Sequence, residues 1–335
     1  MKKLLKVVGA VLVAIVVLAC AALTWLAACR PNQRPASTET IERTPARIAR
    51  GEYLVLNVGD CLGCHSDHTD RLGFPVKTGT EGQGGFAFDE SLGVPGIVCA
   101  QNLTPDPDTG LGAWTDGEVM RATREGISRN GHALFPMMPY HDIHDMSDED
   151  ARAIVVYLRS LRPIRHAVPP THLRFPVNLM VKFTPRPVDG PIATPEDARD
   201  HVAYGRYLTT IAGCRECHTP HDDHGQLVAG REFSGGWEMK GPWGRNFTAN
   251  ITPDPGTFVG QATRELFIAR FLGFAAMASP DEQRPAPPGQ NTIMPWIACS
   301  GMTDQDLGAV YDYLRTEVKP IANSIERFPD APPIR

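Results

Sequence analysis

Two short stretches of the chain place cysteine and histidine at a spacing that can do chemistry. "CLGCH" begins at residue 61 and "CRECH" at residue 214, so that in each stretch two cysteines lie three positions apart and a histidine follows the second. Three kinds of site use parts of this pattern: a zinc site, a redox-active disulfide and covalently attached haem.

Covalent haem attachment accounts for every residue of the pattern, whereas the other two chemistries do not. A structural zinc ion needs four ligands, and one stretch offers three at most. A thioredoxin-like disulfide needs a strand-to-helix setting, which the surrounding sequence does not offer. In c-type haem the two thiols bind the vinyl groups and the histidine ligates the iron. The sequence therefore predicts two haem c groups, held by Cys61, Cys64, His65, Cys214, Cys217 and His218.

The sixth ligand of each iron must lie downstream and recur at a matched position in both copies. Met138 and Met294 do so, because each begins a Met-Pro-aromatic triplet, whereas Met137 does not align. Methionine sulfur is a soft ligand that raises the reduction potential of the iron. We predict Met138 and Met294 as metal ligands beside the two histidines. Met146 and Met302, eight residues further on, are interpreted as core side chains.

Histidine is the rival for the sixth position. None of the remaining candidates recurs between the copies, and two of them follow His218 too closely to reach the opposite face of its haem. We assign them surface or propionate-side roles. These residues are His141, His144, His166, His172, His201, His221 and His224.

The two stretches belong to a unit that the chain repeats once. Each copy opens with Gly-x-Tyr-Leu (51–54 and 205–208), passes through "NLTPD" or "NITPD", and ends in a helix that begins within "MSDED" or "MTDQD". Asn102 and Trp114 either contact the haem propionates or have a structural role. The helix N-caps expected from the sequence are Thr115, in a capping box with Glu118, and Ser147, Thr263 and Thr303.

The N-terminus reads as a membrane segment. Three lysines precede or border an uncharged apolar run over 7–28, which is long enough to span a bilayer and places the following chain outside the cytoplasm. A lipoprotein cleavage box ending at Cys29 and plain secretion are the alternatives. Without those lysines the chain has 30 basic and 38 acidic residues, and this acidic balance argues against nucleic acid as a partner.

Between the copies lies a proline-rich, apolar segment over 163–197. We expect its large apolar side chains to be buried across both units; they are Leu173, Phe175, Val177, Leu179, Met180 and Phe183. Cys99 and Cys299 do not occupy matched positions. Two buried thiols, a disulfide between them, and Cys99 as an axial thiolate all remain open interpretations.

The order C-x-x-C-H, N-[LI]-T-P-D, M-P-[YW] and M-[ST]-D-x-D, over 45–318, resembles the cytochrome c subunits of membrane-bound alcohol, gluconate and related sugar dehydrogenases. It is also similar to stand-alone dihaem cytochromes of that group. The resemblance implies class I cytochrome c folds with axial pairs His65/Met138 and His218/Met294. Those subunits usually carry three haems, and this chain has two attachment motifs, which favours a dihaem carrier.

The expected fold is therefore mainly α, with two tandem class I cytochrome c-like domains behind an N-terminal membrane helix. The expected parts are 1–30 (membrane anchor or signal/lipoprotein segment), 31–44 (linker), 45–162 (cytochrome c domain 1), 163–197 (connector), 198–320 (cytochrome c domain 2) and 321–335 (C-terminal tail).

The expected function is electron transfer rather than enzymatic turnover. A dihaem cytochrome c, tethered to the bacterial inner membrane and facing the periplasm, would take electrons from a dehydrogenase and pass them to a quinone, a cytochrome or an oxidase. The alternative is a dihaem enzyme of the thiosulfate dehydrogenase or cytochrome c peroxidase type, which needs either a cysteine ligand or an iron with an open position.

Overall fold

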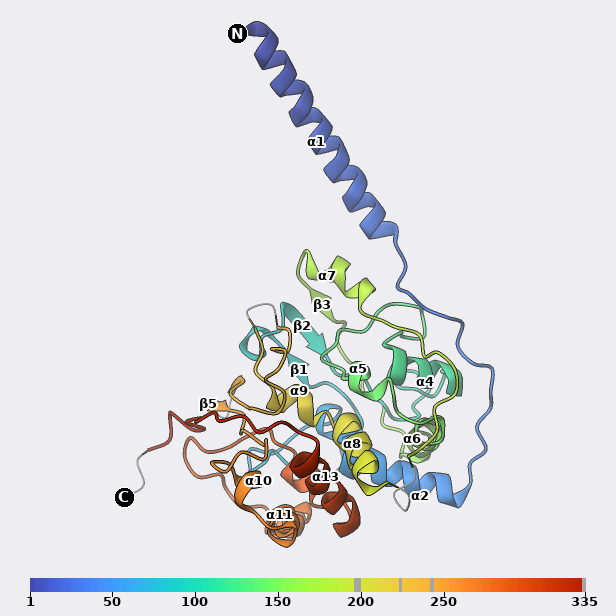
Figure 1. The fold of residues 1–335 in the computed structure, drawn as a ribbon. Helices are drawn as coiled ribbons and strands as arrows, with labels where there is room; N and C mark the ends of the chain where they lie inside the picture. The colour runs from blue at the N-terminus through green and yellow to red at the C-terminus, as the bar shows by residue number, and fades with distance from the viewer. Residues whose placement is uncertain (196–199, 223–224, 242–243, 333–335) are drawn as a thin grey trace.

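The computed structural model describes residues 1–195, 200–222, 225–241 and 244–332 (Figure 1). As expected, helices predominate. They are α1 (Lys2–Ala28), α2 (Pro45–Tyr53), α3 (Cys61–Cys64), α4 (Asp116–Glu125), α5 (Tyr140–Ile143), α6 (Asp148–Ser160), α7 (Val177–Met180), α8 (His201–Ile211), α9 (Cys214–His218), α10 (Phe258–Gln261), α11 (Arg264–Leu272), α12 (Trp296–Cys299) and α13 (Asp304–Thr316).

Short turns of other helix types join them: the π-helix η1 (Leu54–Val58) and the 3₁₀-helices η2 (Glu90–Leu92), η3 (Val181–Phe183), η4 (Ala275–Ala278) and η5 (Pro280–Glu282). The strands are β1 (Ala87–Phe88), β2 (Gly96–Cys99), β3 (His172–Leu173), β4 (Glu238–Gly241) and β5 (Gly244–Phe247). β1, β2 and β3 form one antiparallel sheet, and β4 and β5 form a hairpin. The sequence does not predict these strands, because two to four residues are too few for an alternating pattern.

In each half of the body, the first and last helices cross at a glycine. We call residues 45–162 the first half and residues 200–320 the second half. α2 crosses α6 at Gly51, where an added Cβ would lie 2.0 Å from the carbonyl oxygen of Ala153. α8 crosses α13 at Gly205, where the same atom would lie 1.9 Å from the carbonyl oxygen of Ala309. The glycine of each Gly-x-Tyr-Leu motif is therefore required by the close approach of two backbones.

The predicted helix caps are confirmed. The Thr115 side chain accepts from the N–H of Glu118, whose carboxylate accepts from the N–H of Thr115, so that both bonds of the capping box are present. Ser147, Thr263 and Thr303 accept from N–H groups in the first turns of α6, α11 and α13. These caps fix where the helices on either side of each Met-Pro-aromatic triplet begin.

The asparagine of each "N-[LI]-T-P-D" stretch ties its loop to the chain beyond the last helix. The Asn102 amide donates to the carbonyl of Ile164 at 2.8 Å, and the Asn250 amide donates to that of Ile321 at 2.7 Å. The threonine two positions on, Thr104, donates to the Asn102 side chain at 2.7 Å. Of the two interpretations of Asn102, these bonds support the structural one.

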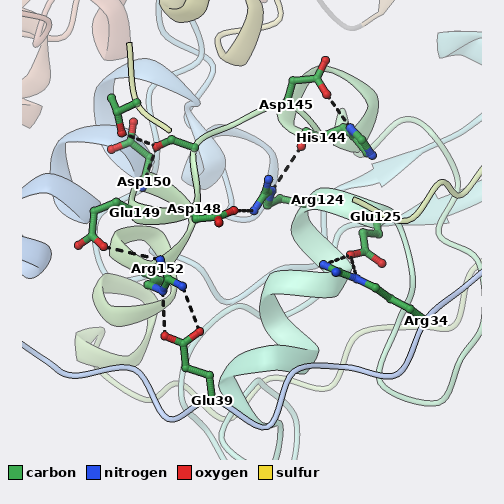
Figure 2. Close-up of polar contacts among 12 residues, drawn as sticks. Arg34, Glu39, Arg124, Glu125, His144, Asp145, Asp148, Glu149, Asp150 and Arg152 are labelled. Carbon is green, nitrogen blue, oxygen red and sulfur yellow. Dashed lines mark hydrogen bonds and ion pairs between the residues drawn. The ribbon is translucent and has the colours of Figure 1, made fainter. Parts of the chain in front are cut away.

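Residues 33–41 form a strap across the first half (Figure 2). Arg34 pairs with Glu125 at 2.7 Å, and Glu39 accepts from Arg152 at 2.9 Å. Ile41 is buried, and its N–H donates to Asp116. The segment expected to be a linker is thus attached to the first half along much of its length.

The expectation that the connector buries its apolar side chains is wrong for three of them. Phe175, Met180 and Phe183 are 68%, 59% and 55% exposed. The backbone here forms α7 and η3, and the buried residues of the described part of the connector are Val181, Pro185 and Val188. A helical turn can bury just one face, so that the other apolar face remains outside.

The buried hydrophobic core is continuous through both halves. It includes Val55 and Ile154 of the first half and Leu208 and Leu307 of the second. Met146 and Met302 lie in it, as predicted. Cys99 and Cys299 are both buried and free, which matches the interpretation as two buried thiols.

α1 stands apart from this core. It is 27 residues long, none of its residues is buried, and it is long and apolar enough to cross a membrane. A signal sequence at an N-terminus has the same properties.

Candidate functional site

Each attachment motif forms a short helix that starts from a residue with left-handed backbone. α3 follows Asp60, whose φ is 43°, and α9 follows Gly213, whose φ is 64°. The sharp change of direction lets a new helix start directly after the preceding one. Within α3 and α9 the two cysteines of each motif are one helical turn apart, so that both point to the same side.

The histidines are held by the same bond in both halves. His65 Nδ1 lies 2.6 Å from the carbonyl oxygen of Gln101, and His218 Nδ1 lies 2.7 Å from that of Ala249. A carbonyl oxygen only accepts, so Nδ1 carries the proton and Nε2 keeps its lone pair. Burial lowers the pKa of both imidazoles, and the bond to the carbonyl opposes that effect only in part. Two neutral imidazoles with a free Nε2 fit iron ligation.

The four cysteines have the properties of thiols rather than of thiolates. Desolvation by the surrounding protein raises the pKa of Cys61, Cys64, Cys214 and Cys217 to about 12. Catalytic and zinc-bound cysteines need the thiolate form, which a positive environment stabilises. Among the described residues, no group of three or more His, Cys, Asp or Glu side chains is gathered for a metal ion. The raised pKa values disfavour the thiolate form that a zinc-bound or catalytic cysteine needs.

The two methionines sit at the start of identical turns. The N–H of Tyr140 donates to the carbonyl of Met138 at 2.7 Å, and the N–H of Trp296 donates to that of Met294 at 2.7 Å. The proline between has φ −78° and ψ 44° in the first case and φ −76° and ψ 58° in the second. These are inverse γ-turns, which proline favours through its fixed φ. Both methionine side chains are partly buried against the core.

The two motifs meet at the junction between the halves. α5, which follows Met138, packs on α8, and α12, which follows Met294, packs on η1. Asp142 of the first half lies 3.7 Å from the Cβ position of Gly213 in the second.

A reciprocal pair of tyrosine bonds joins the halves. Tyr53 donates to Asp306 at 2.5 Å, and Tyr207 donates to Asp150 at 2.6 Å. Each tyrosine comes from a Gly-x-Tyr-Leu motif, and each aspartate is the third residue of the last helix in the other half. Arg50 adds two bonds of 2.8 Å to Asp150. The repeated residues thus connect the two units to each other as well as shaping each unit.

The rival histidines are occupied elsewhere or lie on the surface. Both ring nitrogens of His144 have partners, Asp145 and the carbonyl of Pro187. His201 pairs with Asp312 and His221 with Glu216. His141 and His172 are exposed, His166 is partly buried against Gly85, and His224 lies outside the described residues.

Several residues at this junction were not predicted. Asp60 and Asp142 both carry raised carboxyl pKa values, about 7 and about 6, mainly because of desolvation. The Tyr–Asp pairs could have been found from the repeat, since both partners recur at matched positions. Asp142 could not, because the second copy has no counterpart and its neighbour is far away in sequence.

Comparison with known proteins places the chain among cytochromes. It is 30% identical over 252 residues to a "diheme cytochrome c-type" protein of Cereibacter sphaeroides, covering 72% of this chain and 77% of that one. It is 28% identical over 303 residues to the fructose dehydrogenase cytochrome subunit of Gluconobacter japonicus, covering 85% of this chain and 56% of the subunit. It is 33% identical over 225 residues to a nicotinate dehydrogenase subunit of Pseudomonas putida, covering 66% of this chain and 18% of that protein.

The chain thus spans about half the length of the fructose dehydrogenase subunit and under a fifth of the nicotinate dehydrogenase protein. No family model matches the chain. The resemblance to dehydrogenase cytochrome subunits and to dihaem cytochromes is confirmed by these matches.

Proposed function

Because the chain belongs to the dihaem c-type cytochromes, we propose that it is a membrane-tethered electron carrier. It takes electrons from a dehydrogenase on the outer side of the bacterial inner membrane and passes them to a quinone, a cytochrome or an oxidase. The donor is proposed because relatives are named as cytochrome subunits of fructose dehydrogenase and of other dehydrogenases.

The observation that carries the proposal is the matched geometry of the two motifs. Each half has thiols one turn apart, a histidine whose Nδ1 donates to a backbone carbonyl, and a methionine at the start of an inverse γ-turn. Haem c bound at such a motif supplies one-electron redox chemistry. The carbonyls of Gln101 and Ala249 orient the imidazoles, and we propose His65/Met138 and His218/Met294 as the two axial pairs.

The position of Cys99 speaks against the alternative of a dihaem enzyme with a cysteine ligand. Cys99 is in β2, two residues before Gln101, whose carbonyl accepts from His65 Nδ1. If His65 ligated iron through Nε2, Nδ1 would point away from the metal, and a residue beside the carbonyl partner of Nδ1 would lie on the histidine side of the haem. Cys99 is buried, with its N–H bonded to Thr171, and burial raises the pKa of its thiol.

The junction between the halves suits transfer from one site to the other. The Tyr53–Asp306 and Tyr207–Asp150 bonds and the continuous core hold the motifs in one arrangement. A fixed arrangement avoids the cost of reorganisation at each transfer, so the proposal includes relay between the two haems.

The test is a haem count followed by a turnover assay on the full chain. Denaturing electrophoresis with haem staining and pyridine haemochrome analysis should give two covalent haems per chain. Reduction by a partner dehydrogenase should reach both, while peroxide and thiosulfate assays read background. A count of one, or steady turnover of either compound that a ligand substitution abolishes, would contradict the proposal.

A further inference from the structure

The connector exposes three large apolar side chains. Met180 and Phe183 are three residues apart on consecutive helical turns of α7 and η3, so they project to the same side. Together with Phe175 they are each more than half exposed. Ile97 of β2, in the strand that pairs with β3, is 47% exposed. Single exposed apolar residues are ordinary, but three within nine positions of one segment are not.

The same segment is basic, whereas the rest of the exported chain is acidic. Residues 163–188 contain Arg165, Arg174, Lys182 and Arg186 and no Asp or Glu. Arg174 and Arg186 have the carboxylates of Glu90 and Asp145 as neighbours, yet their side chains remain 69% and 64% exposed. Apolar side chains bordered by exposed cations are the composition that binds at the surface of anionic bilayers.

A direct contact places this surface beside the end of the apolar helix. Lys182 Nζ donates to the carbonyl oxygens of Leu26 and Ala27, at 3.1 and 2.7 Å, in the last turn of α1. Those carbonyls have no partner within the helix, and a cation there complements the helix dipole. Figure 1 shows α7 and β3 at the end of the body that faces α1, with α11 at the opposite end. Trp25, 62% exposed on the same turn of α1, is a residue typical of the membrane interface.

We propose that the surface formed by Phe175, Met180, Lys182 and Phe183 docks into the headgroup region of the leaflet from which α1 emerges, and that it prefers anionic phospholipids. This inference rests on the proposed function in one respect, namely that α1 spans the membrane. The apolar side chains reach into the acyl boundary, and Arg174, Lys182 and Arg186 lie at the level of the phosphates. The body is then fixed with its α7 end on the membrane and α11 away from it.

The test uses the full-length holoprotein in nanodiscs of phosphatidylethanolamine and phosphatidylglycerol. A photocrosslinking amino acid is placed at one of three positions with similar exposure: Met180 in the proposed surface, Leu12 in α1 (57% exposed) and Leu266 in α11 (54% exposed). After illumination, peptide mass spectrometry counts phospholipid adducts. We expect adducts at Leu12 and Met180 and several times fewer at Leu266.

The outcomes separate the docking surface from the anchor. Adducts at Leu12 but only the Leu266 level at Met180 would overturn the docking surface and leave the anchor in place. Adducts at Met180 without adducts at Leu12 would overturn the anchor, and with it the placement of the surface in the leaflet from which α1 emerges. Equal yields at Met180 and Leu266, or adducts at none of the three positions, would also overturn the docking surface.

Two further arms test the chemistry of the surface. Replacing phosphatidylglycerol by phosphatidylcholine should lower the adduct yield at Met180 severalfold and leave that at Leu12 unchanged; an unchanged yield at Met180 would overturn the preference for anionic lipid. The exposed double substitution Phe175→Asp/Phe183→Asp should likewise lower the yield at Met180, with two haems per chain retained as the sign of a folded protein. An unchanged yield in this variant would mean that those rings do not hold the segment on the bilayer.

Discussion

In the first half, Gly82 has left-handed backbone and donates its N–H to Ser66; at the matched place in the second half stands Phe233, with φ 63° and its N–H bonded to Thr219. At the start of the attachment helices the situation is reversed. Asp60, with φ 43°, occupies the position that Gly213 occupies in the second half. Of these two left-handed positions, each half therefore has glycine at one and a residue with a side chain at the other.

This difference shows that both halves have the same backbone conformation at these positions, although the residues that adopt the left-handed conformation differ. The distances from His65 and His218 Nδ1 to their carbonyl partners agree to within 0.1 Å. The distances from the Asn102 and Asn250 amides to their carbonyl partners agree equally well. Phe233 is 4% exposed and packs edge-on to Tyr313. Burying such a ring offsets left-handed strain. At Asp60 the side chain is a carboxylate that packs over Gly63.

The largest expected effect separates the two halves spectroscopically. Met138→Ala and Met294→Ala should each open one iron, lower its potential and let one haem per chain bind carbon monoxide, because methionine stabilises ferrous iron and fills its sixth position. Carbon monoxide difference spectra give the count. Met137→Ala is the matched control and should leave the spectrum unchanged; a changed spectrum there with an unchanged Met138→Ala spectrum would contradict the assignment.

A second comparison sets Phe233 against Gly82. Phe233→Ala should lower the free energy of unfolding by about 3–5 kcal/mol, because it empties a buried site. Gly82→Ala should cost only about 1–2 kcal/mol, because alanine is strained in the left-handed conformation. The added Cβ would lie 3.3 Å from its nearest neighbour, Leu161. Urea unfolding of the oxidised holoprotein, followed by circular dichroism, measures both. Equal costs would show that the ring contributes no packing.

The tyrosine bonds between the halves should be unequal in strength. Tyr53→Phe removes the hydroxyl that donates to Asp306 and should lower the free energy of unfolding by about 1–3 kcal/mol. Tyr207→Phe should cost about 1 kcal/mol or less, because Asp150 keeps both bonds to Arg50. The two single variants and the double variant, compared by the same unfolding assay, test this order. A larger loss for Tyr207→Phe would mean that the arginine does not compensate.

The smallest expected effect is a gain in stability at acidic pH. Burial raises the pKa of Asp60 to about 7, above its unfolded value of about 4. The folded protein thus holds a proton that the unfolded chain has lost between those pH values, so this group makes stability fall as pH rises from about 4 to about 7. Asp60→Gly should add about 1 kcal/mol at pH 4.5 by relieving left-handed strain, and more at pH 8.

Melting temperatures at the two pH values measure the effect of Asp60→Gly. Gly213→Ala, at the matched position, is the control and should destabilise at both pH values alike, because it adds strain without removing a charge. A melting temperature of Asp60→Gly that falls with pH as steeply as that of the unaltered protein would contradict the raised pKa.

The sequence by itself determined the features that depend on neighbouring residues. Two cysteines and a histidine within five positions define an attachment motif, a threonine three residues before a glutamate defines a capping box, and a unit that occurs twice makes matched methionines visible. The resemblance to dihaem cytochromes followed from the same residues. The ligand pairs themselves remain predictions.

Only the tertiary structure decided the contacts that depend on how the two units and α1 are placed. No local pattern brings Asp142 to Gly213 or Lys182 to Ala27, because these partners are separated by scores of residues and belong to different elements. The same reason explains the error at Phe175 and Phe183. An apolar side chain is stabilised by apolar surroundings, which is why the sequence predicted burial. Only the tertiary structure shows that these two rings lie outside the core, on the side where α1 ends.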